Sequence, residues 1–104
     1  MKLWIDDTRP APEGYIWCRT VVEAKSTIDS LEFEKAVKWS DGVTLIDIDH
    51  DAGDYAKYGG DYIKLLEWLE LTRRNYPIRI HSMNPGGVAN MRAIIERNGW
   101  KEIR

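Results

Sequence analysis

Short apolar runs alternate with amphipathic stretches along this chain, and the alternation predicts its secondary structure. Five apolar runs are typical of strands, at residues 2–6, 15–19, 43–48, 78–81 and 100–103. Helices are indicated at 21–31, where Thr20 is a suitable N-cap, from Asp61 to about residue 76, and at 85–98. Strands that alternate with helices indicate an α/β domain with a parallel sheet and right-handed crossovers.

One connection is too short for a helix. The segment between the first two strands, from Asp7 to Gly14, has about eight residues, whereas a helical crossover needs roughly 12. We therefore expect the first crossover helix to be missing or reduced. The nearly continuous apolar run 43–48 is typical of a strand covered on both faces. The 104 residues suffice for one domain, which we expect to span 1–104.

Polar and ionisable side chains follow three of these runs at their carboxyl ends. The three clusters are Asp6-Asp7, Asp47-Ile48-Asp49-His50-Asp51 and His81-Ser82. The carboxyl ends of parallel strands line the ligand-binding edge of an open α/β sheet. We therefore expect these side chains, which include both histidines of the chain, to form one site.

The aspartates predict a site for a hard divalent ion. Adjacent carboxylates such as Asp6 and Asp7 repel each other unless a cation or a basic side chain such as Arg9 lies nearby, and their oxygens suit Mg²⁺ or Mn²⁺. Asp47 and Asp49 would share one face of a continuous strand, because side chains alternate along a strand. Two plainer interpretations stay open: Asp7 with Thr8 starts a turn, and the later aspartates are solvated at the strand tip.

The histidines suit proton transfer. If the third and fourth strands are neighbours, His50 and His81 lie close together and supply a base and an acid on opposite sides of a reacting phosphorus. Asp49 and Asp51 flank His50 and belong to the same candidate catalytic group. A metal-ligand role and a purely structural role for each histidine stay open.

Three further polar residues suit phosphate binding. Arg9 offers a guanidinium that can bind phosphate through two hydrogen bonds. Ser82 and Asn84 precede the last predicted helix, where backbone amides at residues 86–87 would bind an anion. A plain capping role explains Asn84 equally well, so both interpretations stay open.

Composition narrows the class of protein. The chain is 43% hydrophobic and 31% charged, with a formal net charge of -2, so we expect a globular domain with no broad nucleic-acid face. Its one cysteine, Cys18, excludes an intramolecular disulfide and is expected to be a buried, inert thiol. With no apolar run near the ~18 residues of a membrane span and no signal peptide, we expect a cytoplasmic protein with no membrane partner.

The motifs at these positions are similar to those of the cyclic-phosphate-processing receiver-like domain family. They are Asp6-Asp7-Thr8-Arg9-Pro10, Asp49-His50-Asp51 and His81-Ser82-Met83-Asn84-Pro85. The resemblance runs through the whole chain in order. It implies a receiver-like (flavodoxin-like), three-layer fold with a five-stranded parallel sheet in the order 2-1-3-4-5. The first, third and fourth strands are neighbours in that order.

The resemblance also implies roles for single residues. By similarity to receivers, Asp6 and Asp7 are the metal-binding pair, Asp49 holds the position of the phosphoacceptor with Asp47 as the competing register, and Ser82 supplies a hydroxyl. The lysine that receivers carry at the end of their fifth strand has no counterpart in place within 101–104. The implied activity is the processing of a cyclic phosphate, either a 2′,3′-cyclic phosphate RNA end or a cyclic nucleotide signal, in RNA-repair or conflict systems.

Our leading hypothesis is therefore an enzyme that hydrolyses a cyclic phosphodiester. The candidate residues are His50, His81, Asp49 and Asp51 for catalysis, Arg9, Ser82 and Asn84 for phosphate binding, and Asp6, Asp7 and Asp49 for Mg²⁺ or Mn²⁺. Two other hypotheses stay open: a non-catalytic module that binds a cyclic nucleotide or phosphate end, and a phosphoaccepting receiver.

Overall fold

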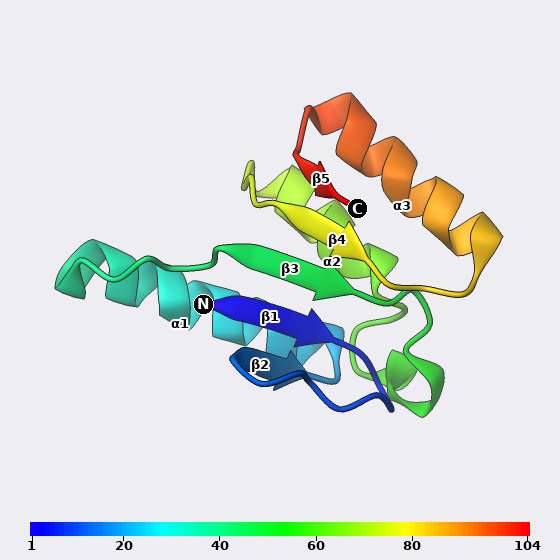
Figure 1. Ribbon diagram of the computed structural model, residues 1–104, viewed down its shortest axis with the longest axis horizontal. Helices are drawn as coiled ribbons and strands as arrows, with labels where there is room; N and C mark the ends of the chain where they lie inside the picture. Colours follow the sequence, from blue (N-terminus) through cyan, green and yellow to red (C-terminus); the bar gives the residue numbers. More distant parts are fainter.

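The strands form one parallel sheet. In the computed structural model, which describes residues 1–104, the strands are β1 (Lys2–Ile5), β2 (Tyr15–Cys18), β3 (Leu45–Ile48), β4 (Ile78–Ile80) and β5 (Glu102–Ile103). Their order across the sheet is β2-β1-β3-β4-β5, and all neighbouring pairs are parallel (Figure 1). The predicted α/β class and strand order are confirmed.

The connection between β1 and β2 contains no helix, as its length predicted. Asp6 fixes its start, because the Asp6 Oδ1 atom accepts hydrogen bonds from the backbone N–H groups of Thr8 (3.0 Å) and Arg9 (2.9 Å). The indole N–H of Trp4 donates to the carbonyl of Arg9 (2.8 Å). These bonds hold Arg9 beside the end of β1.

Helices complete the fold after each of β2, β3 and β4. They are α1 (Val21–Lys38), the 3-10 helix η1 (Gly53–Lys57), α2 (Ile63–Leu71) and α3 (Pro85–Asn98). The predicted caps are present, since the side chains of Thr20 and Asn84 accept backbone N–H groups of α1 and α3. No helix in the structure combines the length and apolar character needed to cross a membrane.

Helix α1 is longer than its apolar spacing predicted, and it runs to Lys38 instead of residue 31. Its added turns leave the core, and Phe33 and Val37 are exposed there. Leucine, glutamate, lysine and alanine are good helix formers and sustain the helix without burial. Apolar periodicity reports only the buried part of a helix, so the prediction stopped where burial stops. Helix α2 is shorter than predicted: it ends at Leu71 instead of about residue 76.

The three α-helices cover one face of the sheet. Leu3, Ile5, Ile46, Ile48 and Ile78 are fully buried on that face. They share one apolar core with the helix residues Val21, Ala24, Ile28, Leu65, Leu66, Leu69, Met91, Ile94 and Ile95. Figure 1 shows the strands in front of α1 and α2.

The opposite face of the sheet has no helix on it, so the fold has two layers where we expected three. Right-handed crossovers that lead in the same direction across a sheet place their helices on the same face. The connections β2 to β3, β3 to β4 and β4 to β5 all lead in one direction. Only β1 to β2 leads the other way, and it lacks its helix. Helices therefore cover β3 on one face and not on both, contrary to what its apolar run predicted.

Candidate functional site

The carboxyl ends of β1, β3 and β4 bring the predicted clusters together. Asp6, Asp49 and His81 each follow the last residue of one of these strands. The ladder continues past the strand ends, because Asp49 N–H donates to the Ile5 carbonyl and His81 N–H donates to the Ile48 carbonyl, both at 2.9 Å. The three side chains therefore stand in one row across the sheet edge.

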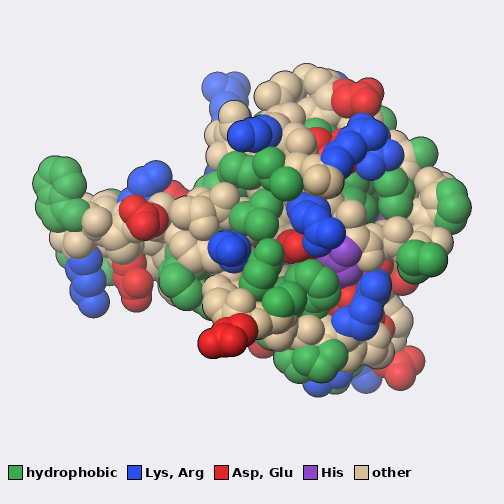
Figure 2. All heavy atoms as spheres, viewed as in Figure 1, with side chains coloured by type: hydrophobic (Ala, Val, Ile, Leu, Met, Phe, Trp, Pro, Cys, Tyr) green, Lys and Arg blue, Asp and Glu red, His purple; other side chains and the backbone are tan.

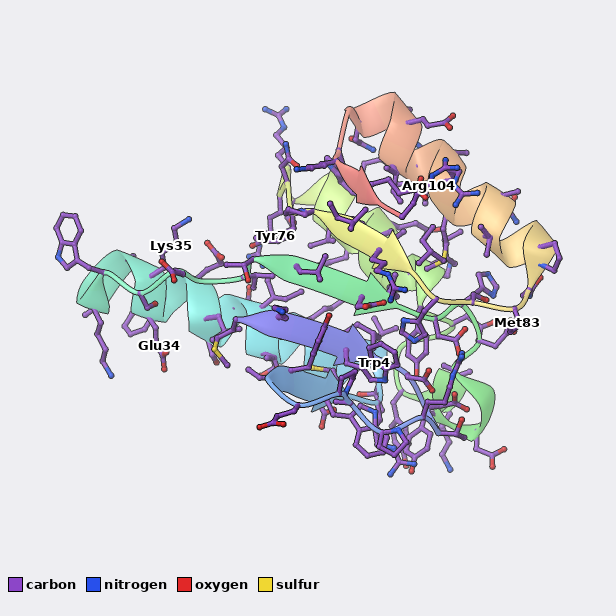
Figure 3. The ribbon with its side chains drawn as sticks, in the orientation of Figure 1. Trp4, Glu34, Lys35, Tyr76, Met83 and Arg104 are labelled. Carbon is purple, nitrogen blue, oxygen red and sulfur yellow. The ribbon has the colours of Figure 1, made fainter.

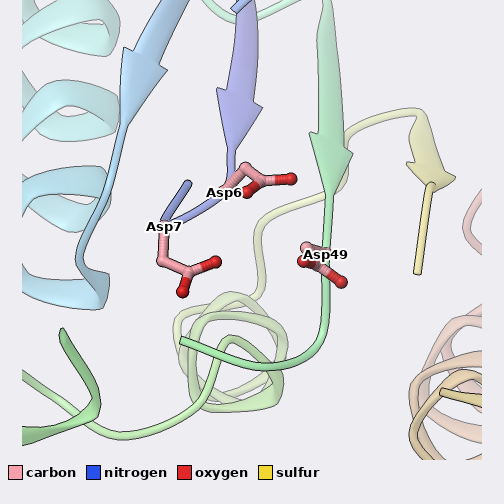
Figure 4. A group of neighbouring side chains, drawn as sticks. All are labelled: Asp6, Asp7 and Asp49. Carbon is pink, nitrogen blue, oxygen red and sulfur yellow. The ribbon is translucent and has the colours of Figure 1, made fainter. Parts of the chain in front are cut away.

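Three carboxylates converge in this row. Asp6, Asp7 and Asp49 each offer an oxygen, and these oxygens lie within 4.8 Å of one another (Figure 4). Asp47 lies one pleat earlier in β3 and is not part of this group. Asp49, and not Asp47, is thus the aspartate that follows β3 and lies beside Asp6 and Asp7.

Asp6 is the most heavily bonded of the three carboxylates. Besides the two loop N–H groups on Oδ1, its Oδ2 atom accepts the Arg9 Nε–H and lies 2.9 Å from His81 Nε2. Burial alone would raise the pKa of Asp6, but the hydrogen bonds from Arg9, Thr8 and His81 outweigh it and the pKa is lowered. Two donors on each oxygen leave this carboxylate with no free lone pair.

Arg9 supplies a cation inside the acidic group. Its Nη2 donates to Asp49 Oδ2 and to the His81 carbonyl, both at 3.2 Å, while its Nε bonds Asp6 at 2.9 Å. Burial would lower the pKa of Arg9, but Asp49 and Asp6 raise it, so the guanidinium stays charged. About half of the Arg9 side chain is exposed, which leaves part of its donor fork open to a ligand.

Asp7 stands in a less favourable setting than Asp6. Burial raises the pKa of Asp7, and the charges of Asp6 and Asp49 raise it further. Gly53, the first residue of η1, has φ +55° and approaches Asp7 so closely that a Cβ on it would lie 2.5 Å from Asp7 Oδ2. Arg19 holds the Asp7 backbone, since its Nε and Nη2 donate to the Asp7 carbonyl at 2.9 and 2.7 Å.

The donor set fits a divalent ion at two of the three acids. Asp7 and Asp49 present carboxylate oxygens of the hard type that Mg²⁺ and Mn²⁺ prefer. Asp6 has its four acceptor positions filled, so an ion would have to displace a protein donor there. Asp7 and Asp49 are therefore the residues that would hold an ion, with Arg9 already balancing part of the charge.

His81 lies in a buried charge network. Its Nδ1 is 2.6 Å from Asp47 Oδ1 and its Nε2 is 2.9 Å from Asp6 Oδ2, and its side chain is only 8% exposed. Arg79 donates to the other Asp47 oxygen at 3.0 Å. Since a carboxylate only accepts, this geometry suits a ring that donates from both nitrogens. The Trp4 ring stacks on the imidazole, with ring centroids 3.8 Å apart and an interplanar angle of 4°; Figure 3 labels Trp4 at the end of β1.

His50 has a different environment from His81. Its Nδ1 lies 2.8 Å from Asp51 Oδ1, while its Nε2 makes no hydrogen bond to protein. Asn84, the cap of α3, points its Nδ2 toward His50 Nδ1 (3.5 Å) and toward Asp51 (3.4 Å). Gly87 packs against the ring so closely that a Cβ on it would lie 2.4 Å from His50 Cγ. Asp51 and Gly87 thus fix the ring and leave one nitrogen free.

The two histidines share no bonding partner. His50 pairs with Asp51 and Asn84, whereas His81 pairs with Asp47 and Asp6. Ser82 joins the α3 start, where its hydroxyl accepts the Asn84 N–H at 3.1 Å.

Sequence reasoning missed three supports of this site: Arg79 on Asp47, Trp4 on His81, and Gly87 against His50. Arg79 could have been found from the strand register, because Asp47 of β3 is paired with Arg79 of β4. Gly87 could have been found because glycine is unfavourable inside a helix, so its presence in the first turn of α3 indicates a close contact. Trp4 carried no such signal, because its neighbour His81 is 77 positions away.

A five-stranded parallel sheet in this order, with acidic residues at the ends of its central strands, defines a receiver-like α/β domain. A family model described as the cyclic-phosphate processing receiver domain matches residues 1–97, and the chain belongs to that family. The resemblance found in the motifs is confirmed. No curated protein and no solved structure shows a significant match to the chain.

Proposed function

We propose that this domain hydrolyses a cyclic phosphodiester, with His50 as the proton-transfer residue. The observation that carries the proposal is the pairing of His50 with Asp51, which leaves Nε2 free at the same sheet edge as Arg9. A carboxylate on Nδ1 fixes the neutral tautomer whose Nε2 accepts a proton. General acid–base catalysis of this kind contributes about 10²–10⁴-fold.

Arg9 and the start of α3 are suited to bind the phosphate. About half of the Arg9 side chain is exposed, and its Nη1 makes no hydrogen bond to protein, so the guanidinium has donors to offer to phosphoryl oxygens. The first turn of α3 presents the backbone N–H of Gly86 and the positive end of the helix dipole, next to Ser82 and Asn84, while the N–H groups of Gly87 and Val88 are bonded to Asn84. A phosphate between these groups would lie beside His50, which packs on Gly87 of the same helix.

The proposed step forms one P–O bond and breaks another. A water oxygen attacks phosphorus and forms a P–O bond, His50 Nε2 takes the proton of that water, and one P–O bond of the ring breaks. Solvent protonates the released oxygen, and the product is a linear phosphate monoester or diester. His81 is a positioning residue in this scheme, because its Nε2 contacts Asp6 Oδ2, the same oxygen that accepts the Arg9 Nε–H.

The divalent ion is part of the proposal and not a requirement of the step. When bound at Asp7 and Asp49, Mg²⁺ or Mn²⁺ would neutralise charge on the phosphoryl oxygens. We also propose the cytoplasm as the location of the protein, because its one buried thiol, Cys18, needs no disulfide partner.

A turnover screen tests the proposal. The substrates are cyclic mononucleotides, cyclic dinucleotides and RNA ending in a 2′,3′-cyclic phosphate, each with and without Mg²⁺ or Mn²⁺. We expect one class to be converted to its linear phosphate by the wild type, and much less by His50→Gln. Tight binding without product would favour a non-catalytic module. A stoichiometric phosphoryl adduct after incubation with acetyl phosphate, seen by intact-mass spectrometry, would favour a phosphoaccepting receiver.

A further inference from the structure

The two faces of the sheet differ in chemistry. The helix-covered face carries the aliphatic side chains of Leu3, Ile5, Ile46, Ile48 and Ile78, all fully buried. The uncovered face carries Lys2, Trp4, Tyr15, Trp17, Leu45, Asp47, Arg79 and Ile103. Lys2 and Arg79 are exposed in the strands of this face. A face meant for a packed helix would hold aliphatic residues at these positions, so the composition favours contact with a polar ligand.

Aromatic rings and cations are paired on the uncovered face. Trp4 and Tyr15 meet edge to face with centroids 5.9 Å apart, and the Lys2 ammonium lies 5.1 Å from the Tyr15 ring. The Arg19 guanidinium lies 4.9 Å from the Trp17 ring. Figure 2 shows hydrophobic and basic side chains interspersed over the strands, next to the histidine.

The face carries little negative charge despite the acidic balance of the whole chain. Asp47 is the one acidic strand residue on it, since Glu102 is in register with Ile78 and belongs to the helix side. Asp47 is fully buried and is bonded by Arg79 and His81. The exposed charges of this face are therefore cationic.

The aromatic row leads directly into the candidate site. Trp4 stacks on His81, and the Trp17 indole N–H donates to the Asp6 carbonyl at 2.7 Å. A chain that lay on these rings would reach Arg9 and the acidic group without a gap.

We propose that this face binds single-stranded RNA and delivers its cyclic-phosphate end to the site, an inference that rests on the proposed function. Aromatic rings on an open sheet stack with unpaired bases, and the neighbouring cations pair with the backbone phosphates. A strand that ends in a cyclic phosphate has to be RNA, because the ring is closed through the ribose 2′-hydroxyl. The substrate class is thus an RNA end and not a free cyclic mononucleotide.

Binding of a single-stranded oligonucleotide with a 3′-hydroxyl tests the face without any turnover. Tyr15→Leu removes one stacking ring, and we expect the affinity to fall about tenfold or more. Lys2→Glu removes a cation, and we expect the dependence of log affinity on log salt to flatten by about 0.7 for each phosphate that the variant no longer neutralises. The matched controls are Trp39→Leu and Lys38→Glu at the far end of α1, where Trp39 is 94% exposed.

The controls should bind the oligonucleotide as the wild type does. Equal affinities for Tyr15→Leu, Lys2→Glu and both controls would overturn the proposal. Activity provides an independent readout, since Lys2→Glu should lower kcat/KM for a cyclic-phosphate RNA end by about the factor by which it lowers oligonucleotide affinity, and Lys38→Glu should not lower it. If Lys2→Glu loses binding and the wild type turns over none of the substrates, the RNA-binding face is retained and the proposed hydrolysis is rejected.

Discussion

At the scale of single residues, the two histidines differ in what their nitrogens are free to do. His81 has a carboxylate on each ring nitrogen and a tryptophan on its ring face. Both of its nitrogens are thus occupied by protein contacts. His50 has one carboxylate and one free nitrogen. Under the proposed function, His50 would therefore transfer the proton and His81 would position Asp6.

Substitution of each histidine by alanine tests this division. His50→Ala should lower kcat by ~10²–10⁴-fold with an unchanged Tm, because it removes a proton-transfer group from a partly exposed position. His81→Ala should lower the free energy of unfolding by about 3 kcal/mol, because it leaves two buried carboxylates without a shared cation. Thermal unfolding and steady-state kinetics on both variants measure these effects. A His81→Ala protein with wild-type Tm and a kcat loss equal to that of His50→Ala would restore the base-and-acid pair predicted from sequence.

A divalent ion held by Asp7 and Asp49 would compete with Arg9 for the Oδ2 atom of Asp49. We expect Mn²⁺ to raise the Tm of the wild type, with about 2.7 kcal/mol of stabilisation at a hundredfold excess over Kd. Asp7→Asn should abolish the shift, and Arg9→Met should enlarge it, because it frees Oδ2 atoms of Asp6 and Asp49. Asp54→Asn, outside the acidic group, is the control. If Mn²⁺ leaves the Tm of both the wild type and Arg9→Met unchanged, an ion site at these aspartates is excluded.

At the scale of elements, the start of α3 connects the fold to the chemistry. Asn84 caps the helix through its Oδ1 and directs its Nδ2 toward His50 and Asp51. The following Pro85 suits the first helical position. Gly87 then allows the His50 ring to pack directly on the helix backbone. The first turn of α3 thus positions both the Gly86 N–H, a proposed phosphate donor, and the His50 ring, the proposed base.

The glycine pair of this turn allows a matched test. Gly87→Ala would place a Cβ 2.4 Å from His50 Cγ, so we expect the ring to move and kcat to fall by at least tenfold. Gly86→Ala meets nothing closer than Asn84 Oδ1 at 3.7 Å, and it should keep its activity and gain up to about 1 kcal/mol of helix stability. Kinetics and thermal unfolding of both variants measure this difference. Equal activity in the two variants would show that the His50 position is not set by α3.

At the scale of the whole molecule, ion pairs join the helices and the edge strand. Glu70 of α2 accepts hydrogen bonds from Arg97 and Asn98 of α3, and Arg92 of α3 pairs with Glu102 of β5. The hydrogen bonds from Arg97 and Asn98 lower the pKa of Glu70 to about 2. Arg92 lowers the pKa of Glu102 in the same way. The contacts that dock α3 and β5 therefore depend on ionised carboxylates.

These pairs predict a loss of stability in acid. A carboxyl whose folded pKa is depressed stabilises the fold above its unfolded pKa, and this contribution disappears as the pH falls. For Glu70 the window runs from about 4.5 down to about 2. We expect the Tm to fall through this range, and to fall less in Glu70→Gln than in the wild type. The control Glu34→Gln, at an exposed position of α1, should follow the wild type. Parallel Tm curves for all three proteins would exclude a role of Glu70 in acid unfolding.

The local pattern of the chain determined its elements and the place of its site. Apolar alternation located the strands, Thr20 and Asn84-Pro85 located two helix starts, and the eight-residue connection predicted the missing helix. These features depend on neighbours in sequence, so they can be read one segment at a time. Polar clusters after three strands also placed Asp6, Asp49 and His81 at one edge, because parallel strands all end there.

Only the tertiary structure decided which of these groups touch. The bonds of His81 to Asp6 and Asp47 span 75 and 34 positions of the chain, and no local pattern encodes such distances. Arg9 is close in sequence to Asp6, but its bond to Asp49 spans 40 positions and is likewise set by the tertiary structure. Which face of the sheet stays without helices depends on the directions of all the crossovers together. Which charged side chains pair, and which face of the sheet the helices cover, are decided only in the packed chain, because both depend on residues that lie far apart in the sequence.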